Sequence, residues 1–399
     1  MWHWKVHARK RLHAKCPFIA RHVAAWAAAL ALSGPYVAGS SALAASRDAH
    51  QSHLRPVQAV SHTTLTVAGG ALAYYASEDL QQPQPNIRRA IIVIHGKLRN
   101  SDQYYANMHE EAAQVEGTSA SREILVIAPQ FLSMLDTAPN HVAPDVLRWR
   151  GNGWMAGEPA VAPSPVSSYA ALDAFLKILS DRSRFPQLRE VVLAGHSGGA
   201  QVVQRYAFAS QAAAALTRQG IPVRFLVASP SSYLYFDEKR PVSTPDVSAP
   251  SPSEVAAGYE KTAPLSVNFE PFDGAHCPNF NDWKYGTNAL SPYVRDQWAQ
   301  TKEGAEKREQ AYMRLDLTYL VGGNDDDPQQ SALDKSCAAE AQGPQRVARA
   351  AAYQAYLHQR DNLTVAQPFY IVPGVGHNES RMFKSVCARH VLFGTAGCD

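Results

Sequence analysis

Short runs of apolar residues recur along the chain and are separated by polar turns and longer amphipathic segments. Two polar-bounded runs near the start, Thr63–Val67 and Ala71–Tyr75, predict a β-hairpin. Six later runs also predict strands, and the first three of them are continuous and rich in aliphatic residues, which is typical of strands buried on both faces. The six runs are Ala90–Ile94, Ile124–Ala128, Val191–Ala194, Val223–Ala228, Leu315–Val321 and Phe369–Val372.

Helical periodicity fills most of the intervals between these runs. We expect helices over Tyr104–Glu116, from Ser167 or Ser168 to about Ser180, after Gly199, over Pro292–Ala311, over Pro344–Leu357 and after Glu379. Strands that alternate with helices predict an α/β fold, with a mostly parallel central sheet and helices on both of its faces.

The N-terminal region has the pattern of a secretory signal peptide. Residues 1–22 carry six basic residues and no acidic one, and the apolar run Val23–Leu32 and a small-residue stretch ending in Ala44 and Ala45 follow. We predict a signal peptide over residues 1–44, cut after Ala44 or Ala45, and a polar leader over 45–60. A membrane anchor would need about 20 apolar residues, and Gly34 and Pro35 interrupt this run too early. The mature protein is then periplasmic or extracellular, with no stable membrane span.

Signal removal also changes the charge of the chain. The 399 residues carry a formal charge of +3, but without the six N-terminal cations 32 basic residues face 35 acidic ones. This slightly acidic balance gives no electrostatic reason to expect a nucleic-acid partner.

The cysteine count fits an exported protein. Cys16 leaves with the signal, and the four remaining cysteines are Cys277, Cys337, Cys387 and Cys398. An even number predicts two disulfides, with three possible connectivities. We favour Cys387 with Cys398, which are close in sequence, and by default Cys277 with Cys337. The cysteines do not have the spacing of metal ligands, so we expect no metal and no cofactor.

The stretch after Val191–Ala194 carries the clearest chemical signal. The residues Gly195-His196-Ser197-Gly198-Gly199 lie between a predicted strand and a predicted helix. This is the context in which Gly-x-Ser-x-Gly forms a nucleophile elbow, and it makes Ser197 a candidate nucleophile. The alternative is a glycine-rich turn whose serine only caps the helix.

Two further strands run into polar loops. Gly322-Gly323-Asn324-Asp325 follows one of them, and Gly374-Val375-Gly376-His377 follows the last one. Since sites in open α/β sheets lie beyond the carboxyl ends of the strands, Ser197, Asp325 and His377 should meet on one rim. Asp326 or Asp327 could replace Asp325, although the Gly-x-x-Asp spacing favours Asp325.

Three other histidines, His95, His196 and His276, are conceivable metal ligands. His95 and His196 are expected to be structural or to line the site. Grouping them with His276 in a metal cluster has no support, because the sequence has neither HxH nor HExxH spacing.

These motifs, with a strand that ends in His95-Gly96 and with the chain order Ser…Asp…His, resemble those of the α/β-hydrolase superfamily over residues 63–392. The resemblance implies one hydrolase domain over 61–399. It also implies that Ser197 is the nucleophile, that His377 is the general base and then acid, and that Asp325 orients His377. The backbone N–H groups of Lys97 and Gly198 would form the oxyanion hole.

Residues 234–290 show no regular periodicity and are rich in proline and aromatic residues. This superfamily often has a lid or cap between the nucleophile half and the acid strand, so we expect one here. The alternative is a loop packed on the body away from the site.

The sequence thus predicts an exported serine hydrolase that cleaves a small-molecule or polymeric carboxylic ester through an acyl-enzyme. Two alternatives remain open at this stage. One is a peptidase or amidase that uses the same triad, and the other is a non-catalytic binding protein on a hydrolase fold.

Overall fold

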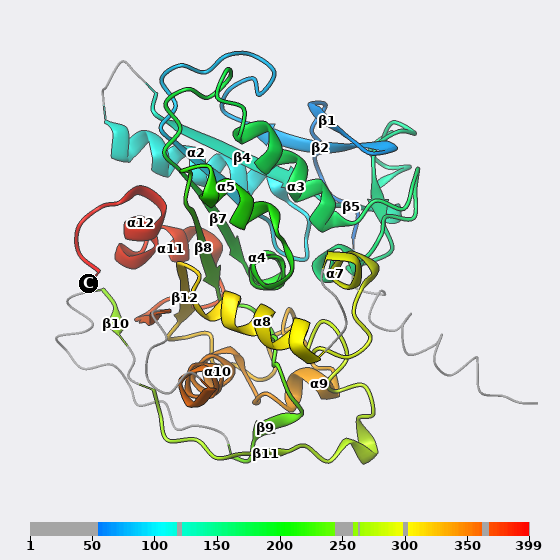
Figure 1. Cartoon of the computed structure of the whole chain (residues 1–399), viewed down its shortest axis with the longest axis vertical. Helices are drawn as coiled ribbons and strands as arrows, with labels where there is room; N and C mark the ends of the chain where they lie inside the picture. The colour runs from blue at the N-terminus through cyan, green and yellow to red at the C-terminus, as the bar shows by residue number, and fades with distance from the viewer. Residues whose placement is uncertain are drawn as a thin grey trace, which may run out of the picture. The chain divides into compact units, whose positions relative to one another are not determined.

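A nine-stranded sheet forms the centre of the computed structural model, which describes residues 55–117, 122–243, 258–261, 264–297, 302–360 and 367–398 (Figure 1). In order across the sheet, the strands are β1 (Thr64–Val67), β2 (Gly70–Ala76), β4 (Ile124–Gln130), β3 (Arg89–Ile94), β7 (Glu190–His196), β8 (Val223–Ala228), β12 (Leu317–Gly322), β13 (Phe369–Val372) and β10 (Glu260–Lys261). The six strands from β4 to β13 are parallel, and β1, β2 and β10 are antiparallel additions at the two ends.

The central strands are buried on both faces, which explains their continuous apolar runs. In β3, Ile91 and Val93 belong to one hydrophobic cluster, whereas Ile92 and Ile94 belong to the other. Successive side chains of a strand point to opposite faces, so one apolar run serves two cores.

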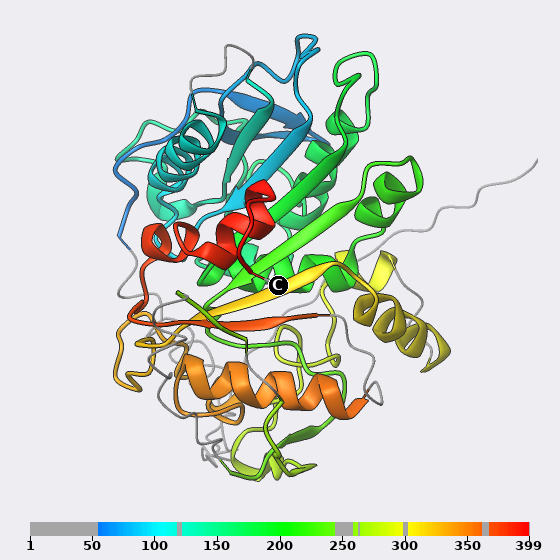
Figure 2. The same cartoon turned by 90° about the vertical axis from the view of Figure 1, so that its left-hand side faces the viewer.

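Helices cover both faces of this sheet, as predicted (Figure 2). One face packs against α2 (Ser101–Glu116), α11 (Glu379–Phe383) and α12 (Val386–Phe393). The other packs against α3 (Ser168–Leu179), α4 (Gly198–Ala209), α5 (Ala212–Arg218), α8 (Lys302–Met313) and α10 (Arg346–Arg360). The prediction of an α/β fold with a mostly parallel central sheet and helices on both faces is therefore confirmed.

Several element boundaries differ from the predictions. The single helix expected over Pro292–Ala311 is divided into α7 (Pro292–Gln297) and α8. The last helix is also two helices, because the Ser385 side chain accepts a hydrogen bond from the Ala388 N–H and begins α12 anew. Helix α2 begins earlier than expected, at Ser101, whose buried hydroxyl lies 3.0 Å from the carbonyl oxygens of Ala128 and Pro129.

The remaining elements are too short to give a periodic signal. The long segment before α3 contains β5 (Leu132–Ser133), β6 (Arg148–Trp149) and the 3₁₀ turns η1 (Met134–Asp136) and η2 (Gly153–Ala156). The region 234–290 contains β9 (Lys239–Pro241), β10, β11 (Phe269–Pro271) and η3 (Gly274–His276), and β9 pairs with β11. Helix α9 (Cys337–Glu340) precedes α10.

The predicted signal peptide and most of the leader lie outside the described residues. Within the residues that the structure does describe, no helix is both long and apolar enough to cross a membrane.

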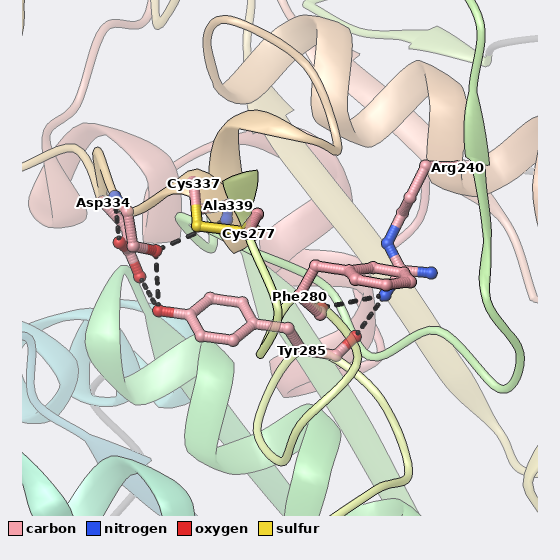
Figure 3. Close-up of a disulfide and its surroundings, with 8 residues drawn as sticks. Arg240, Cys277, Phe280, Tyr285, Asp334, Cys337 and Ala339 are labelled. Carbon is pink, nitrogen blue, oxygen red and sulfur yellow. Dashed lines mark hydrogen bonds between the residues drawn. A yellow bond between two sulfur atoms is a disulfide. The ribbon is translucent and has the colours of Figure 1, made fainter. Parts of the chain in front are cut away.

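Two disulfides, Cys277–Cys337 and Cys387–Cys398, are present, which is the pairing favoured from the sequence. The first joins the region 234–290 to α9. Figure 3 shows it beside two contacts of that region, the hydrogen bond from Tyr285 to Asp334 and the stacking of Arg240 on Phe280. Disulfides persist in oxidising compartments, so both bonds indicate an extracytoplasmic environment.

Replacing both Cys277 and Cys337 by serine should lower the free energy of unfolding by about 2–4 kcal/mol. The bond spans 60 residues, against 11 for Cys387–Cys398. In the chain-entropy account, the longer loop makes its loss costlier by about 1–2 kcal/mol. Urea unfolding of the two double-serine variants measures this difference, and a larger loss for the Cys387–Cys398 pair would contradict it.

Candidate active site

Ser197 lies in a sharp turn between β7 and α4. Its backbone has φ 58° and ψ −117°, a conformation that is strained for any residue except glycine, and its N–H donates to the carbonyl oxygen of Ala228 at 3.0 Å. The turn is possible because a Cβ on Gly199 would lie 2.0 Å from the carbonyl oxygen of Ile94. Gly199, two residues after the serine, therefore lets the first turn of α4 pack directly on β3.

The structure brings Ser197, His377 and Asp325 together in a hydrogen-bonded chain. His377 Nε2 lies 2.9 Å from Ser197 Oγ, and His377 Nδ1 lies 2.8 Å from Asp325 Oδ2. Since the carboxylate can only accept, Nδ1 carries the proton and Nε2 is free to accept the serine proton. Asp326 and Asp327 are exposed, and Asp325 alone of the three acidic residues contacts His377.

The loops that carry Asp325 and His377 are packed directly on each other. The Asn324 N–H donates to the carbonyl oxygen of Val375 at 2.9 Å. A Cβ on Gly322 would lie 2.3 Å from that same oxygen, so glycine is needed at this approach. The glycines that marked these loops in the sequence thus bring the acid and the histidine within hydrogen-bonding distance.

Arg346, at the start of α10, is a site residue that the sequence analysis missed. Its Nη1 donates to Asp325 Oδ1 at 2.9 Å, and its Nη2 donates to Ser231 Oγ at the same distance. Both side chains of the ion pair are almost fully buried, with 1% and 2% exposed. The available signal was the position of Arg346 and Arg349 on the stripe of α10 that also contains the buried Tyr353. A buried cation requires a partner.

Arg346 changes the acid–base properties of the triad. Burial alone would raise the pKa of Asp325, but the hydrogen bond from His377 and the charge of Arg346 outweigh it, so this pKa is lowered. The pKa of His377 is lowered from its ordinary value of 6.5, first by burial and then by the charge of Arg346, against the opposing effect of Asp325. His377 is therefore neutral at pH 7 and can act as a base.

His95 and His196 are buried beside the triad. Burial lowers the pKa of His95 to about 4, so its ring is neutral. Its Nδ1 donates to the carbonyl oxygen of Gly96 at 2.8 Å, and its Nε2 accepts from the Phe131 N–H at 3.0 Å. The ring of His196 packs against that of His377, with 4.5 Å between centroids. Burial also holds the pKa of His196 well below 6.5.

The predicted oxyanion donors, the N–H groups of Lys97 and Gly198, lie next to each other. A Cβ on Gly198 would be 3.1 Å from Lys97 N. Neither N–H donates a hydrogen bond within the part of the chain that the structure describes. His95 holds the carbonyl of the Gly96–Lys97 peptide, so it also fixes the direction of the Lys97 N–H.

A second buried ion pair fixes the loop after β3. Arg99 Nε donates to Asp136 Oδ2 at 2.8 Å, and both side chains are fully buried. Arg99 also donates to the carbonyl oxygen of Lys97 at 3.2 Å. Neither member of this pair was found from the sequence, because it joins a turn to the irregular segment before α3.

His276 is in η3, whereas His196 packs against His377 and His95 is bonded to Gly96 and Phe131, so these three histidines do not form the conceivable metal cluster. Among the residues that the structure describes, no group of three or more histidine, cysteine, aspartate or glutamate side chains could hold a metal ion.

A mostly parallel sheet with a serine, a histidine and an aspartate at its carboxyl edge defines an α/β protein with hydrolase-like geometry. A model of the alpha/beta hydrolase family matches residues 91–385, and the chain belongs to this family. It is therefore a hydrolase of the α/β fold. A search of the curated proteins found no sequence match.

Two solved structures share the fold at low sequence identity. The first is LpqC, a poly(3-hydroxybutyrate) depolymerase from Bordetella parapertussis, with 18% identity and a TM-score of 0.53 over 86% of this chain and 92% of that one. The second is poly(aspartic acid) hydrolase-1 from Sphingomonas sp. KT-1, with 18% identity and a TM-score of 0.52 over 85% of this chain and 99% of that one. At this identity the likeness establishes the fold alone.

Removing the charge of Arg346 should raise the pKa of His377. In Arg346→Met the nearby positive charge is lost and Asp325 stabilises the imidazolium without competition, whereas Arg346→Lys should retain part of the lowering. Loss of one partner of a buried pair should also cost about 3–5 kcal/mol of stability. NMR titration of the His377 imidazole measures the pKa in each folded variant.

Arg349→Met is the matched control, because Arg349 lies on the same helix but donates to main-chain carbonyl oxygens, including those of Gly343 and Ser231. It should shift the pKa of His377 less than Arg346→Met does. An equal or lower pKa in Arg346→Met would contradict the role given to Arg346.

Proposed function

We propose that this chain is an exported serine hydrolase that cleaves a carboxylic ester through an acyl-enzyme intermediate. The observation that carries the proposal is the continuous hydrogen-bonded chain from Ser197 Oγ through His377 to Asp325, with contacts of 2.9 and 2.8 Å. Ser197 is the nucleophile, His377 is the general base and then acid, and Asp325 keeps the proton on His377 Nδ1.

In the first half-reaction, Ser197 Oγ attacks the ester carbonyl carbon while its proton passes to His377 Nε2. The carbonyl oxygen, on which negative charge develops, accepts hydrogen bonds from the N–H groups of Lys97 and Gly198. Collapse of this intermediate breaks the bond to the alcohol oxygen, which takes the proton from His377. Water then attacks the acyl-enzyme by the same route and releases the acid and free Ser197.

The two structural neighbours leave open a polymeric substrate, and they do not decide between an ester and an amide bond. One of them is named for an ester polymer and the other for poly(aspartic acid), whose bonds are amides. We propose an ester because the alcohol oxygen of an ester is a better leaving group than the amine nitrogen of an amide. A panel of substrates with both bond types distinguishes the two.

Export is part of the proposal. The basic and apolar pattern of residues 1–44 supports a cleaved signal peptide, and the two disulfides fit the oxidising compartment that export would reach.

We also propose that the region 234–290 is a lid that lines the substrate site. Trp283 Nε1 donates to the carbonyl oxygen of Ala156 at 2.6 Å, and Lys284 Nζ donates to Gln201 Oε1 at 2.8 Å. Gln201 lies one turn along α4 from Ser197, since its N–H donates to the Ser197 carbonyl oxygen. These contacts support a lid that reaches the nucleophile helix.

A fluorophosphonate should add once to the mature protein by intact mass, and Ser197→Ala should abolish the adduct. The variant should also lower kcat for 4-nitrophenyl esters by about 10⁴–10⁶-fold, because it lacks the proposed nucleophile. Ser183→Ala, in an exposed turn, serves as the control and should behave like the wild type. A folded wild type that takes no adduct would favour the non-catalytic reading.

The lid proposal predicts slower hydrogen–deuterium exchange in residues 264–290 once Ser197 carries a phosphonate adduct. The bound group should stabilise the contacts of this segment with α4, while α5 provides an internal control. Unchanged exchange in 264–290 would leave this region as a loop packed away from the site.

A further inference from the structure

The loops around Ser197 hold more positive than negative charge. Three buried or partly buried carboxylates lie around the site with one cation each: Asp136 pairs with Arg99, Asp325 pairs with Arg346, and Asp334 lies 3.4 Å from Lys284 Nζ. A fourth carboxylate, Glu379, lies near Tyr104 and accepts a hydrogen bond from Asn107. Three further cations have neutral acceptors. Within the described chain, Lys97, Arg205 and Arg349 donate only to main-chain oxygens or to uncharged side chains.

Lys97 is the accessible member of this group. It is partly exposed, and its Nζ donates a hydrogen bond to the carbonyl oxygen of Ser331 at 3.1 Å. Arg205 and Arg349, in contrast, are fully buried. A lysine that is bonded to a neutral carbonyl can exchange it for a carboxylate, because the opposite charge of the carboxylate adds Coulomb attraction to the hydrogen bond.

The position of Lys97 in the chain places its side chain next to the proposed reaction centre. Its backbone N–H is one of the proposed oxyanion donors, so the side chain begins beside the ester carbonyl. Its side chain extends toward Ser331, in the loop that follows Asp325. The charge of Lys97 helps to lower the pKa of His377, and burial together with the charge of Arg346 lowers the pKa of Lys97.

Lys284 adds a second partly exposed ammonium from the lid. Its side chain is 19% exposed, and its Nζ donates to Gln201 Oε1, one turn from Ser197. The charge of Asp334 acts on both Lys97 and Lys284. Two further acids are near these cations, Glu158 and Glu340, but both are exposed, so water screens them.

We propose that Lys97, supported by Lys284, forms a carboxylate-binding subsite beside Ser197, and that the ester hydrolysed by this site carries a carboxylate close to the scissile bond. The inference rests on the proposed function and narrows its substrate class to acidic esters. The ammonium of Lys97 leaves the Ser331 carbonyl to water and pairs with the substrate carboxylate. The surplus positive charge also attracts such a substrate from solution.

The test compares two matched pairs of esters. For a carboxylate on the acyl side, the pair is benzyl hydrogen glutarate and benzyl methyl glutarate, followed by release of benzyl alcohol. For the alcohol side, it is 4-(acetoxymethyl)benzoate and its methyl ester. We expect kcat/KM to favour the free acid by about tenfold or more in at least one pair, as a hydrogen bond to a charged group provides.

The ratio of kcat/KM for the free acid to kcat/KM for its methyl ester, measured in Lys97 variants, shows whether Lys97 binds the substrate carboxylate. Lys97→Met keeps the backbone N–H but removes the charge, so the ratio should fall toward one. Lys97→Arg should keep the preference, and Lys97→Glu should reverse it. Lys177→Met, which removes an exposed lysine of α3, is the matched control and should keep the wild-type ratio. Added salt should reduce the preference by screening.

The outcomes separate this inference from the function beneath it. Hydrolysis of both esters of each pair without preference for the acid, or a preference that Lys97→Met leaves unchanged, overturns the carboxylate subsite and leaves the serine hydrolase intact. Absence of hydrolysis together with absence of a fluorophosphonate adduct overturns both.

Discussion

The buried carboxylate of Asp325 is the constraint on which the arrangement of the site depends. A buried charge is costly unless its hydrogen-bonding capacity is met, and Asp325 meets it with His377 on one oxygen and Arg346 on the other. Arg346 is in turn held by Ser231, which follows β8. The ends of β8, β12 and β13 and the start of α10 are thus joined through one carboxylate.

A buried ion pair also fixes the loop after β3, which carries the proposed oxyanion donor Lys97. There the buried Arg99–Asp136 pair holds the loop after β3, while the neutral ring of His95 bridges Gly96 and Phe131. Both pairs are buried, so solvent screens them little and they hold the loops in one arrangement. Donors that are fixed before charge develops need no reorganisation during the reaction, which is the physical advantage of such rigid loops.

Much of the fold could be predicted from the sequence, because its signals are local. A buried parallel strand is a short apolar run, and the elbow is a run of five residues whose glycines meet a steric demand that the structure makes explicit at Gly199. The relation between Ser197, Asp325 and His377 followed from one topological rule about strand ends. The two-residue and three-residue strands β5, β6, β9, β10 and β11 are too short to carry any periodicity.

What the sequence could not provide was the choice of partners for buried charges. Arg346 is 21 residues from Asp325, and Arg99 is 37 residues from Asp136, so neither pair has a characteristic spacing. The helix that carries Arg346 was predicted, and a cation on its buried stripe was visible. Its partner depended on how separate loops pack, which only the folded chain determines.

At residue 97, the proposed substrate recognition and the proposed catalytic contact depend on different atoms of the same residue. The constraints on its loop act on main-chain atoms: His95 and Arg99 hold the carbonyl groups of residues 96 and 97, and the proposed contact with the oxyanion is a backbone N–H. The side chain at this position is therefore free to vary without moving the atoms that would perform the chemistry. A single substitution at residue 97 would then change which substrates the enzyme prefers, while the backbone atoms of the catalytic site keep their positions.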